Sequence, residues 1–229
     1  MTSHLALANI QPEPLPPEFA GDDVRFPPAL VETFLKEFTR AGDIIFDPFA
    51  GFGTTLIAAE ALGRIPYGVE RDARRAEYIR ARLRQPQNLI HGDTRQLAAL
   101  NLPPLDFSIT SPPYTNRADP EDPLTEYATP GRGYRAYLRD LQAIYAQLAR
   151  KMKPGATVVV EVANLKKEGV VTPLAWDVAA ALSRVLRFEG ETVVCWDRYG
   201  YGYEHSYCLR FTAPARRGAR PAPARSASP

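Results

Sequence analysis

Two short segments combine residue types that could do chemistry. Residues 47–55 read Asp-Pro-Phe-Ala-Gly-Phe-Gly-Thr-Thr, and residues 111–114 read Ser-Pro-Pro-Tyr. The two glycines of the first segment let a turn lie close to a ligand, because they carry no Cβ. Backbone N–H groups at the start of a following helix suit a carboxylate. In the second segment, the Ser111 hydroxyl and the Pro112 carbonyl can both accept hydrogen bonds from one amino group.

Two further acids extend the first segment into a candidate nucleoside site. Glu70 follows Gly51 by nineteen residues and ends the next apolar stretch, where an acid can bind both hydroxyls of a ribose. Asp93 follows a third stretch, where its carboxylate can accept from an adenine amino group. Taken singly, each acid could instead cap a helix or face solvent in a turn.

The elements that must position these residues alternate between strand and helix signals. Helices are expected where apolar residues recur every three to four positions, at 30–38, 54–62, 73–83, 134–152 and 172–186. Strands are expected at 44–46, 66–70, 88–91, 106–110, 157–162, 192–196 and 206–211. This alternation predicts a doubly wound α/β fold with a mostly parallel sheet. The last two strands are too close in sequence for a parallel crossover, so they must form an antiparallel hairpin.

A dinucleotide site is the competing interpretation of the glycine turn. Its Gly-x-Gly-x-x-Gly pattern fails here, because Leu56 or Ile57 stands where the third glycine would be.

Residues 47–55 and 111–114 together resemble the S-adenosylmethionine-dependent amino-methyltransferases, which modify the exocyclic nitrogen of cytosine or adenine in DNA. The resemblance covers about residues 25–212 and implies their Rossmann-like fold with a seven-stranded, mostly parallel sheet. One departure is Phe52, which stands where the family usually has serine.

The resemblance also implies roles for individual residues. S-adenosyl-L-methionine is the implied cofactor, with Asp47 accepting from its amino group and Thr54 and Thr55 capping the helix that receives its carboxylate. The implied cofactor-binding residues are Phe26, Asp47, Phe49, Ala50, Gly51, Gly53, Thr54, Thr55, Glu70 and Asp93. The implied catalytic residues are Ser111, Pro112, Pro113 and Tyr114.

The second segment predicts a direct methyl transfer that needs no covalent enzyme intermediate. Its two prolines stiffen the loop, and Tyr114 offers a flat face for a base taken out of the duplex. In the family, serine at the first position usually accompanies cytosine N4 activity, so we expect cytosine N4 in DNA. Adenine N6 in DNA, an RNA base, and a non-catalytic cofactor-binding scaffold remain as alternatives. Protein glutamine is less expected, because that group has Asn-Pro-Pro-Tyr.

DNA is the expected partner, RNA is the alternative, and no dedicated recognition segment is evident. Specificity is therefore low, or a partner subunit or a second copy of the chain supplies it, as in restriction-modification systems, or the target is RNA or single-stranded DNA. Tyr199, Tyr201 and Tyr203 alternate with glycine in the loop of the last hairpin. They could stack on bases, or they could be amphipathic residues of a glycine-rich hairpin tip without a binding role.

Composition sets the remaining expectations. The chain has 229 residues and 45% apolar content, enough for one core. We expect an arm at 1–24, a methyltransferase domain at 25–213 and a disordered Arg/Pro/Ala tail at 214–229. No apolar run is long enough to span a membrane, no secretory signal is evident, and two cysteines fit a reducing, cytoplasmic interior. No CxxC or HxxxH spacing predicts a metal site.

Overall fold

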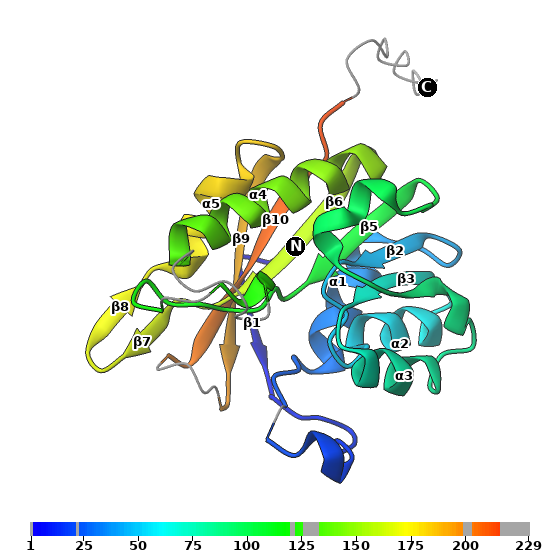
Figure 1. Ribbon diagram of the computed structural model, residues 1–229, viewed down its shortest axis with the longest axis horizontal. Coiled ribbons are helices and arrows are strands. Elements are labelled where there is room, and N and C mark those ends of the chain that lie inside the picture. The colour runs from blue at the N-terminus through cyan, green and yellow to red at the C-terminus, as the bar shows by residue number, and fades with distance from the viewer. Residues whose placement is uncertain (1, 22, 120–121, 126–132, 199–202, 216–229) are drawn as a thin grey trace, which may run out of the picture.

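One large sheet organises the computed structural model, which describes residues 2–21, 23–119, 122–125, 133–198 and 203–215. In this part of the chain, eight strands follow the order β1-β9-β10-β6-β5-β2-β3-β4 (Figure 1). Their bounds are β1 His4–Leu7, β2 Ile44–Asp47, β3 Ile65–Glu70, β4 Leu89–His91, β5 Leu105–Thr110, β6 Met152–Val162, β9 Arg187–Trp196 and β10 His205–Thr212.

The sheet has the expected polarity. Strands β2 to β6 run parallel to their neighbours, whereas β10 is antiparallel to both β6 and β9. The doubly wound α/β fold with a C-terminal antiparallel hairpin is therefore confirmed, and all seven expected strands are present. Because β2, β3, β5 and β6 are parallel, their carboxyl ends meet at one edge of the sheet, where ligands of such folds bind.

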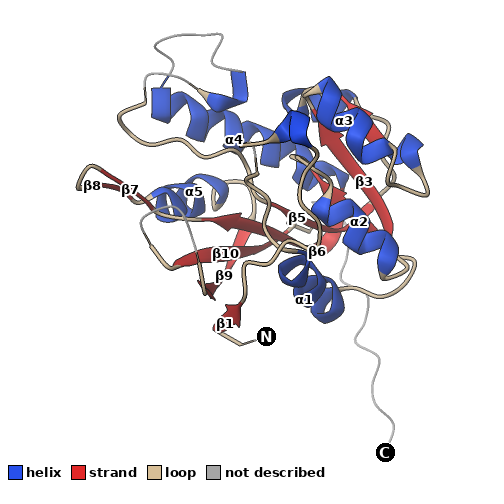
Figure 2. Ribbon diagram, turned by 90° about the horizontal axis from the view of Figure 1, so that it is seen from below, coloured by secondary structure: helices blue, strands red, loops and turns tan. Residues whose placement is uncertain are grey.

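Helices cover both faces of the sheet. The α-helices are α1 Pro28–Phe38, α2 Thr54–Ala61, α3 Ala73–Arg80, α4 Gly133–Lys151 and α5 Leu174–Leu182. Short 3-10 helices are η1 Pro17–Phe19, η2 Pro86–Asn88, η3 Thr94–Ala99 and η4 Pro123–Thr125. Figure 2 shows α4 and α5 on one side of β6 and β10 and α1 on the other.

Alternation along β6 builds the two halves of the core. Val158 and Val160 pack with the buried side chains of α4 and α5, while Val159 between them packs with α1. This is the period of two that a strand covered on both faces requires.

The N-terminal segment differs from the expected arm. His4–Leu7 forms the edge strand β1, parallel to β9, with Leu5 opposite Val194. Leu5 and Leu7 pack against the core cluster that includes α1. Four alternating residues are too short a signal to read from sequence alone.

A second small sheet was also not expected. β7 (Leu165–Lys167) and β8 (Val170–Thr172) form a two-stranded antiparallel hairpin between β6 and α5. The helix expected at 172–186 is correspondingly shorter, because Pro173 is its N-cap.

Two expectations fall largely outside the described residues. They are most of the tail at 214–229 and the loop tyrosines 199 and 201. In the described part of the chain, no helix is both long and apolar enough to cross a membrane.

Candidate active site

Ser111 lies where three cavities adjoin at the carboxyl edge of the sheet. The largest, of about 440 Å³, is bordered by the glycine turn, Glu70 and Asp93. A narrow one runs beneath Asp47 and the start of α2. The third, of about 330 Å³, is bordered by Tyr114 and other polar and aromatic residues. Because Ser111 lines all three, the two segments singled out from the sequence lie together.

The glycine turn joins β2 to α2 in a conformation that its glycines require. Gly51 and Gly53 have φ angles of +58° and +83°, in the left-handed region that side chains disfavour. A Cβ on Gly53 would also lie 2.9 Å from Ile79 Cγ2 of α3. The turn is thus specified twice, by backbone angle and by packing.

Thr54 and Thr55 do not cap α2, contrary to expectation. They are its first two residues, and Gly53 is the N-cap without a side-chain hydrogen bond. The N–H of Gly51 donates to Glu70 Oε2 at 2.7 Å, and that of Gly53 donates to the Ala50 carbonyl at 2.7 Å. The donors left for a ligand carboxylate are therefore those of the first helical turn, which have no intrahelical acceptor.

Asp47 ends β2 as a buried carboxylate beside the narrow cavity. Its Oδ1 accepts from the Thr110 hydroxyl at 2.5 Å and from the Phe49 N–H at 2.9 Å. Burial raises the pKa of Asp47 to about 6, although these hydrogen bonds oppose the shift. A ligand ammonium would repay this burial by stabilising the charged form.

Glu70 ends β3 and ties the glycine turn to the start of α3. Its two oxygens accept from the N–H groups of Gly51 and, at 2.8 Å, Asp72. Burial raises the pKa of Glu70, while these N–H donors pull it back. Each carboxylate oxygen has a further lone pair, so Glu70 can still accept from two hydroxyls in the largest cavity.

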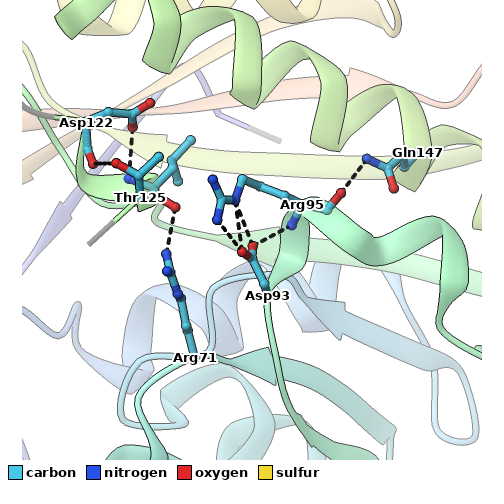
Figure 3. A network of polar contacts seen from close by, with 7 residues as sticks. Arg71, Asp93, Arg95, Asp122, Thr125 and Gln147 are labelled. Carbon is cyan, nitrogen blue, oxygen red and sulfur yellow. Dashed lines mark hydrogen bonds and ion pairs between the residues drawn. The ribbon is translucent and has the colours of Figure 1, made fainter. Parts of the chain in front are cut away.

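Asp93 follows β4 and borders the same cavity, but Arg95 already binds its carboxylate. Asp93 is the N-cap of η3, and the Arg95 guanidinium reaches Oδ2 at 2.5 Å (Figure 3). Burial alone would raise the pKa of Asp93, but the hydrogen bonds from Arg95 outweigh it and lower the pKa. Asp93 thus makes the contacts of a helix cap, which is the structural alternative to a role in binding adenine.

A contact missed from the sequence closes the far side of the largest cavity. Arg71 Nη1 donates to the Leu124 carbonyl at 2.7 Å, which holds η4 over the cavity (Figure 3). Asp122 is fully buried and accepts from the Leu124 N–H at 2.9 Å. No sequence pattern marks this contact, since its partners are 53 residues apart.

Three phenylalanines in or near the glycine turn divide into two groups: two line cavities and one is buried in the core. Phe49 lines the largest and the narrow cavities, and Phe26 lines the narrow and the third. Phe52 turns away into the structure, where it is 4% exposed and meets Phe19 edge-on at a ring distance of 5.1 Å. The Arg75 guanidinium covers its ring at 4.7 Å. The phenylalanine in place of serine therefore anchors the N-terminal segment.

The Ser-Pro-Pro-Tyr loop starts a chain of hydroxyl groups that ends on a buried acid. Ser111 Oγ donates to Tyr114 Oη at 3.3 Å, and Tyr114 Oη donates to Glu161 Oε2 at 2.6 Å. Glu161, near the end of β6, is only 3% exposed. Pro112 is buried and Pro113 half-buried, which fixes the loop between the cavities.

The third cavity draws its walls from distant parts of the chain. Five stretches contribute, and the lining residues are Asn9, residues 23–27, Ser111, Tyr114, Glu161 and Trp196. Sequence reasoning missed Glu161 and Trp196. An acid inside a β-branched strand is the one signal that could have found Glu161.

Metal ligation has no support at this edge. In the described ranges, no three His, Cys, Asp or Glu side chains gather as a group that could hold an ion.

Comparison with known proteins finds sequence similarity in about the N-terminal third of the chain. The sequence model of the DNA methylase family matches residues 16–81, which include the glycine turn and Glu70. These residues of the chain are therefore similar in sequence to DNA methylases. A segment of 46 residues is 48% identical to the Type II methyltransferase M.MjaII of Methanocaldococcus jannaschii. That segment covers 20% of this chain and 9% of the relative's length.

Solved structures share the fold. TrmN from Thermus thermophilus superposes with a TM-score of 0.60 at 18% identity, covering 86% of this chain and 52% of that one. A TehB-like S-adenosylmethionine-dependent methyltransferase from Corynebacterium glutamicum gives a TM-score of 0.54 at 14% identity, covering 86% and 92%. At these identities the likeness to both structures concerns the fold.

Proposed function

We propose that the protein transfers a methyl group from S-adenosylmethionine to the exocyclic amine of a DNA base, with cytosine N4 as the preferred target. The observation that carries this proposal is the position of Ser111, which borders a nucleoside-sized cavity, a narrow cavity beside Asp47 and a third, base-sized cavity. The match of residues 16–81 to the DNA methylase family supports the same activity.

The residues around the first two cavities fit the cofactor. Glu70 would bind the ribose hydroxyls, Asp47 the amino group, and the first turn of α2, at Thr54 and Thr55, the carboxylate. Ala50, Gly51 and Gly53 shape the floor, and Phe49 and Phe26 flank the cofactor. Asp93 would meet the adenine amino group with the lone pairs that Arg95 leaves unused. When bound, the cofactor supplies an electrophilic methyl group on a sulfonium.

The chain's own residues would then position the amine and remove its proton. Ser111 Oγ and the Pro112 carbonyl would accept hydrogen bonds from the two N–H groups of the target amine. These bonds would direct the nitrogen lone pair toward the cofactor, across the point where the three cavities adjoin. Tyr114 holds the base in the third cavity, whereas Pro113 borders the largest cavity on the cofactor side. After transfer, the amine's surplus proton passes to Ser111 Oγ, the serine proton to Tyr114 Oη, and the tyrosine proton to Glu161. Each group donates one proton and accepts one, so the relay ends with Glu161 neutral.

Positioning accounts for most of the rate in this scheme. A reacting nitrogen held within about 3.5 Å of the methyl carbon avoids the entropic cost of a bimolecular encounter. The stiffness of the two prolines therefore matters as much as the acidity of any group.

The decisive experiment is incubation of the protein with isotopically labelled S-adenosylmethionine and either DNA or RNA, followed by mass spectrometry of the nucleosides. We expect label in N4-methyldeoxycytidine. Label in N6-methyladenine would change the target base and keep the reaction, and label in RNA alone would change the polymer. Absence of label from every nucleoside, with cofactor bound, would favour a non-catalytic scaffold.

Assembly is part of the proposal. All three cavities are lined by residues of one chain, and site specificity would come from a partner subunit or a second copy. Light scattering of the protein with and without DNA distinguishes these arrangements.

A further inference from the structure

The β7–β8 hairpin extends beyond the body on the side of α5 (Figures 1 and 2). It is a separate two-stranded sheet that pairs with no strand of the large one. We use the name hairpin patch for five residues. Four belong to the hairpin, Lys166, Lys167, Val170 and Val171, and the fifth is Trp176 of the neighbouring α5.

The base of the hairpin is bonded to the candidate active site. The N–H of Arg117, three residues beyond Tyr114, donates to Thr172 Oγ1 of β8 at 3.1 Å. On the other side, Asn164 Oδ1 accepts from the Ala175 N–H of α5 at 3.0 Å. The hairpin also begins four residues after Glu161. Its position is therefore fixed relative to the third cavity.

The hairpin patch exposes apolar and cationic side chains together. Val170, Val171 and Trp176 are 64%, 46% and 44% exposed. Lys166 lies opposite Val171 and Lys167 opposite Val170, so each face of the ribbon carries one cation and one valine. Within the described ranges, neither lysine has a carboxylate at ion-pair distance. Exposed apolar residues beside unneutralised cations are typical of a contact surface.

A row of aromatic rings continues the hairpin patch along β10. Trp176 packs against Tyr207 at a ring distance of 4.9 Å, and His205 lies 5.3 Å from Tyr207 and 5.3 Å from Tyr203. Tyr203 just before β10 and His205 and Tyr207 within it are half-buried, and Trp176 ends the row as its most exposed member. Such rows offer π-faces to unstacked bases.

We propose that the hairpin patch binds the DNA strand that flanks the target base, with the two lysines, one from each face of the ribbon, on phosphates and Trp176 stacked on a neighbouring base. This rests on the proposed function, because a base in the third cavity must leave the helix and unstack its neighbours. The hairpin stands at the edge of the sheet where that strand would pass. The positive charge of the two lysines complements the phosphates of a nucleic acid. An apolar protein surface would have no use for these cations.

The test compares three variants with the wild-type protein. The double variant Lys166→Ala/Lys167→Ala removes the cations, and Trp176→Ala removes the ring. The control Lys36→Ala/Arg187→Ala removes two exposed cations from the opposite edge of the sheet, at the end of α1 and the start of β9. Binding to a labelled duplex and to its single strand is followed by fluorescence anisotropy over a series of salt concentrations.

We expect the lysine variant to lower the slope of log affinity against log salt by about 1.4 to 1.8, because two phosphate contacts are lost. Trp176→Ala should weaken single-strand binding by roughly fivefold or more at constant slope. The control should match the wild-type protein, and all variants should keep its unfolding midpoint, since the altered side chains are exposed.

Unchanged affinity and slope in both hairpin variants would overturn the proposal, and so would an equal loss in the control. Preferential binding of RNA over DNA would also contradict it. Analysis of labelled nucleosides from the same samples distinguishes failure of this inference from failure of the proposed function. If the hairpin variants bind normally but the wild-type protein methylates DNA, only the role of the hairpin patch is excluded.

Discussion

The cofactor-facing half and the target-facing half of the edge are built in different ways. Around the cofactor, each acid follows its own strand, and the strands are consecutive along this side of the sheet: Asp47 ends β2 and Glu70 ends β3. Around the target cavity, the walls come from the N-terminal segment, the Ser111 loop, β6 and β9. The acids of the first half therefore lie close together in sequence, although Ser111 and Leu124 also border its cavity, whereas the second half depends wholly on long-range folding.

The two halves also hold their acids differently. Asp47 and Glu70 both accept from backbone N–H groups in or beside the turn, and Asp47 also accepts from the Thr110 hydroxyl. Glu161 accepts from Tyr114, which lies 47 residues away. A substitution in the target-facing half should thus change turnover without changing cofactor affinity, and the predictions below test that separation.

Ser111→Ala should have the largest effect. Loss of the hydroxyl that orients the amine and starts the relay should lower kcat by about 100-fold or more, with the cofactor Kd unchanged. The matched control is Ser108→Ala, which removes a buried hydroxyl that has no hydrogen-bond partner in the described structure. Steady-state kinetics and calorimetry measure the two quantities. Equal losses of kcat and cofactor affinity would place Ser111 in the cofactor site instead.

Glu161→Gln should come next. The amide keeps the shape but is a much weaker proton acceptor, so kcat should fall by roughly 10-fold to 100-fold while cofactor affinity stays the same. Glu191→Gln, an exposed position on β9, serves as the control. Normal turnover of the Glu161 variant would remove the relay from the account.

Glu70→Ala should act on the cofactor-facing half alone. It removes the partner of two ribose hydroxyls and of the Gly51 N–H, so cofactor binding should weaken by about 1–3 kcal/mol. Calorimetric titration measures this loss, and thermal unfolding shows whether the turn remains folded. A Glu70 variant that binds cofactor like the wild-type protein would exclude this residue from the site.

Cofactor affinity should also depend on pH through Asp47. Burial raises the pKa of Asp47 to about 6, so its carboxylate is charged above that pH and neutral below it. If the charged form binds the cofactor ammonium, affinity should fall roughly tenfold as pH drops from about 8 to about 5. Asp47→Asn should bind weakly and flatten this dependence.

The raised pKa of Asp47 also makes the free energy of unfolding depend on pH, in the direction opposite to cofactor affinity. Since the folded-state pKa is raised above the ordinary value of 3.8, the charged form is disfavoured in the folded protein. The stabilising contribution is fully present below pH 3.8 and is lost as pH rises through about 6, by up to about 3 kcal/mol. Urea unfolding of Asp47→Asn at neutral pH should therefore show a more stable protein, and a less stable one would contradict this explanation.

Asp93→Ala should give the smallest effect. Because Arg95 already occupies its carboxylate, loss of Asp93 should change cofactor affinity by less than about threefold. A loss as large as that of Glu70→Ala would restore Asp93 as a principal adenine ligand.

The sequence predicts the local half of this site and misses the long-range half. Asp47, Glu70 and the glycine turn could be located because each lies at a strand–helix boundary that periodicity reveals. Phe52 was recognised as a departure, but its packing against Phe19 depends on a segment that shows no periodicity. Glu161 looks from sequence like one residue of a buried strand, and its contact with Tyr114 exists only after β5 and β6 pair.

The same reasoning explains the fold-level differences. β2 and β4 have only four and three residues, but each stands between segments with helical periodicity, so the strand–helix alternation predicts them. β1, β7 and β8 are equally short and stand outside that alternation, so their sequences give no sufficient signal.

A crystal structure of the protein with S-adenosylhomocysteine tests the central claim most directly, since that product keeps every contact except the methyl group. The account predicts the ribose on Glu70, the carboxylate at the first turn of α2, and the sulfur facing Ser111 across the junction of the three cavities. A sulfur pointing away from Ser111, or a ligand bound elsewhere, would contradict it.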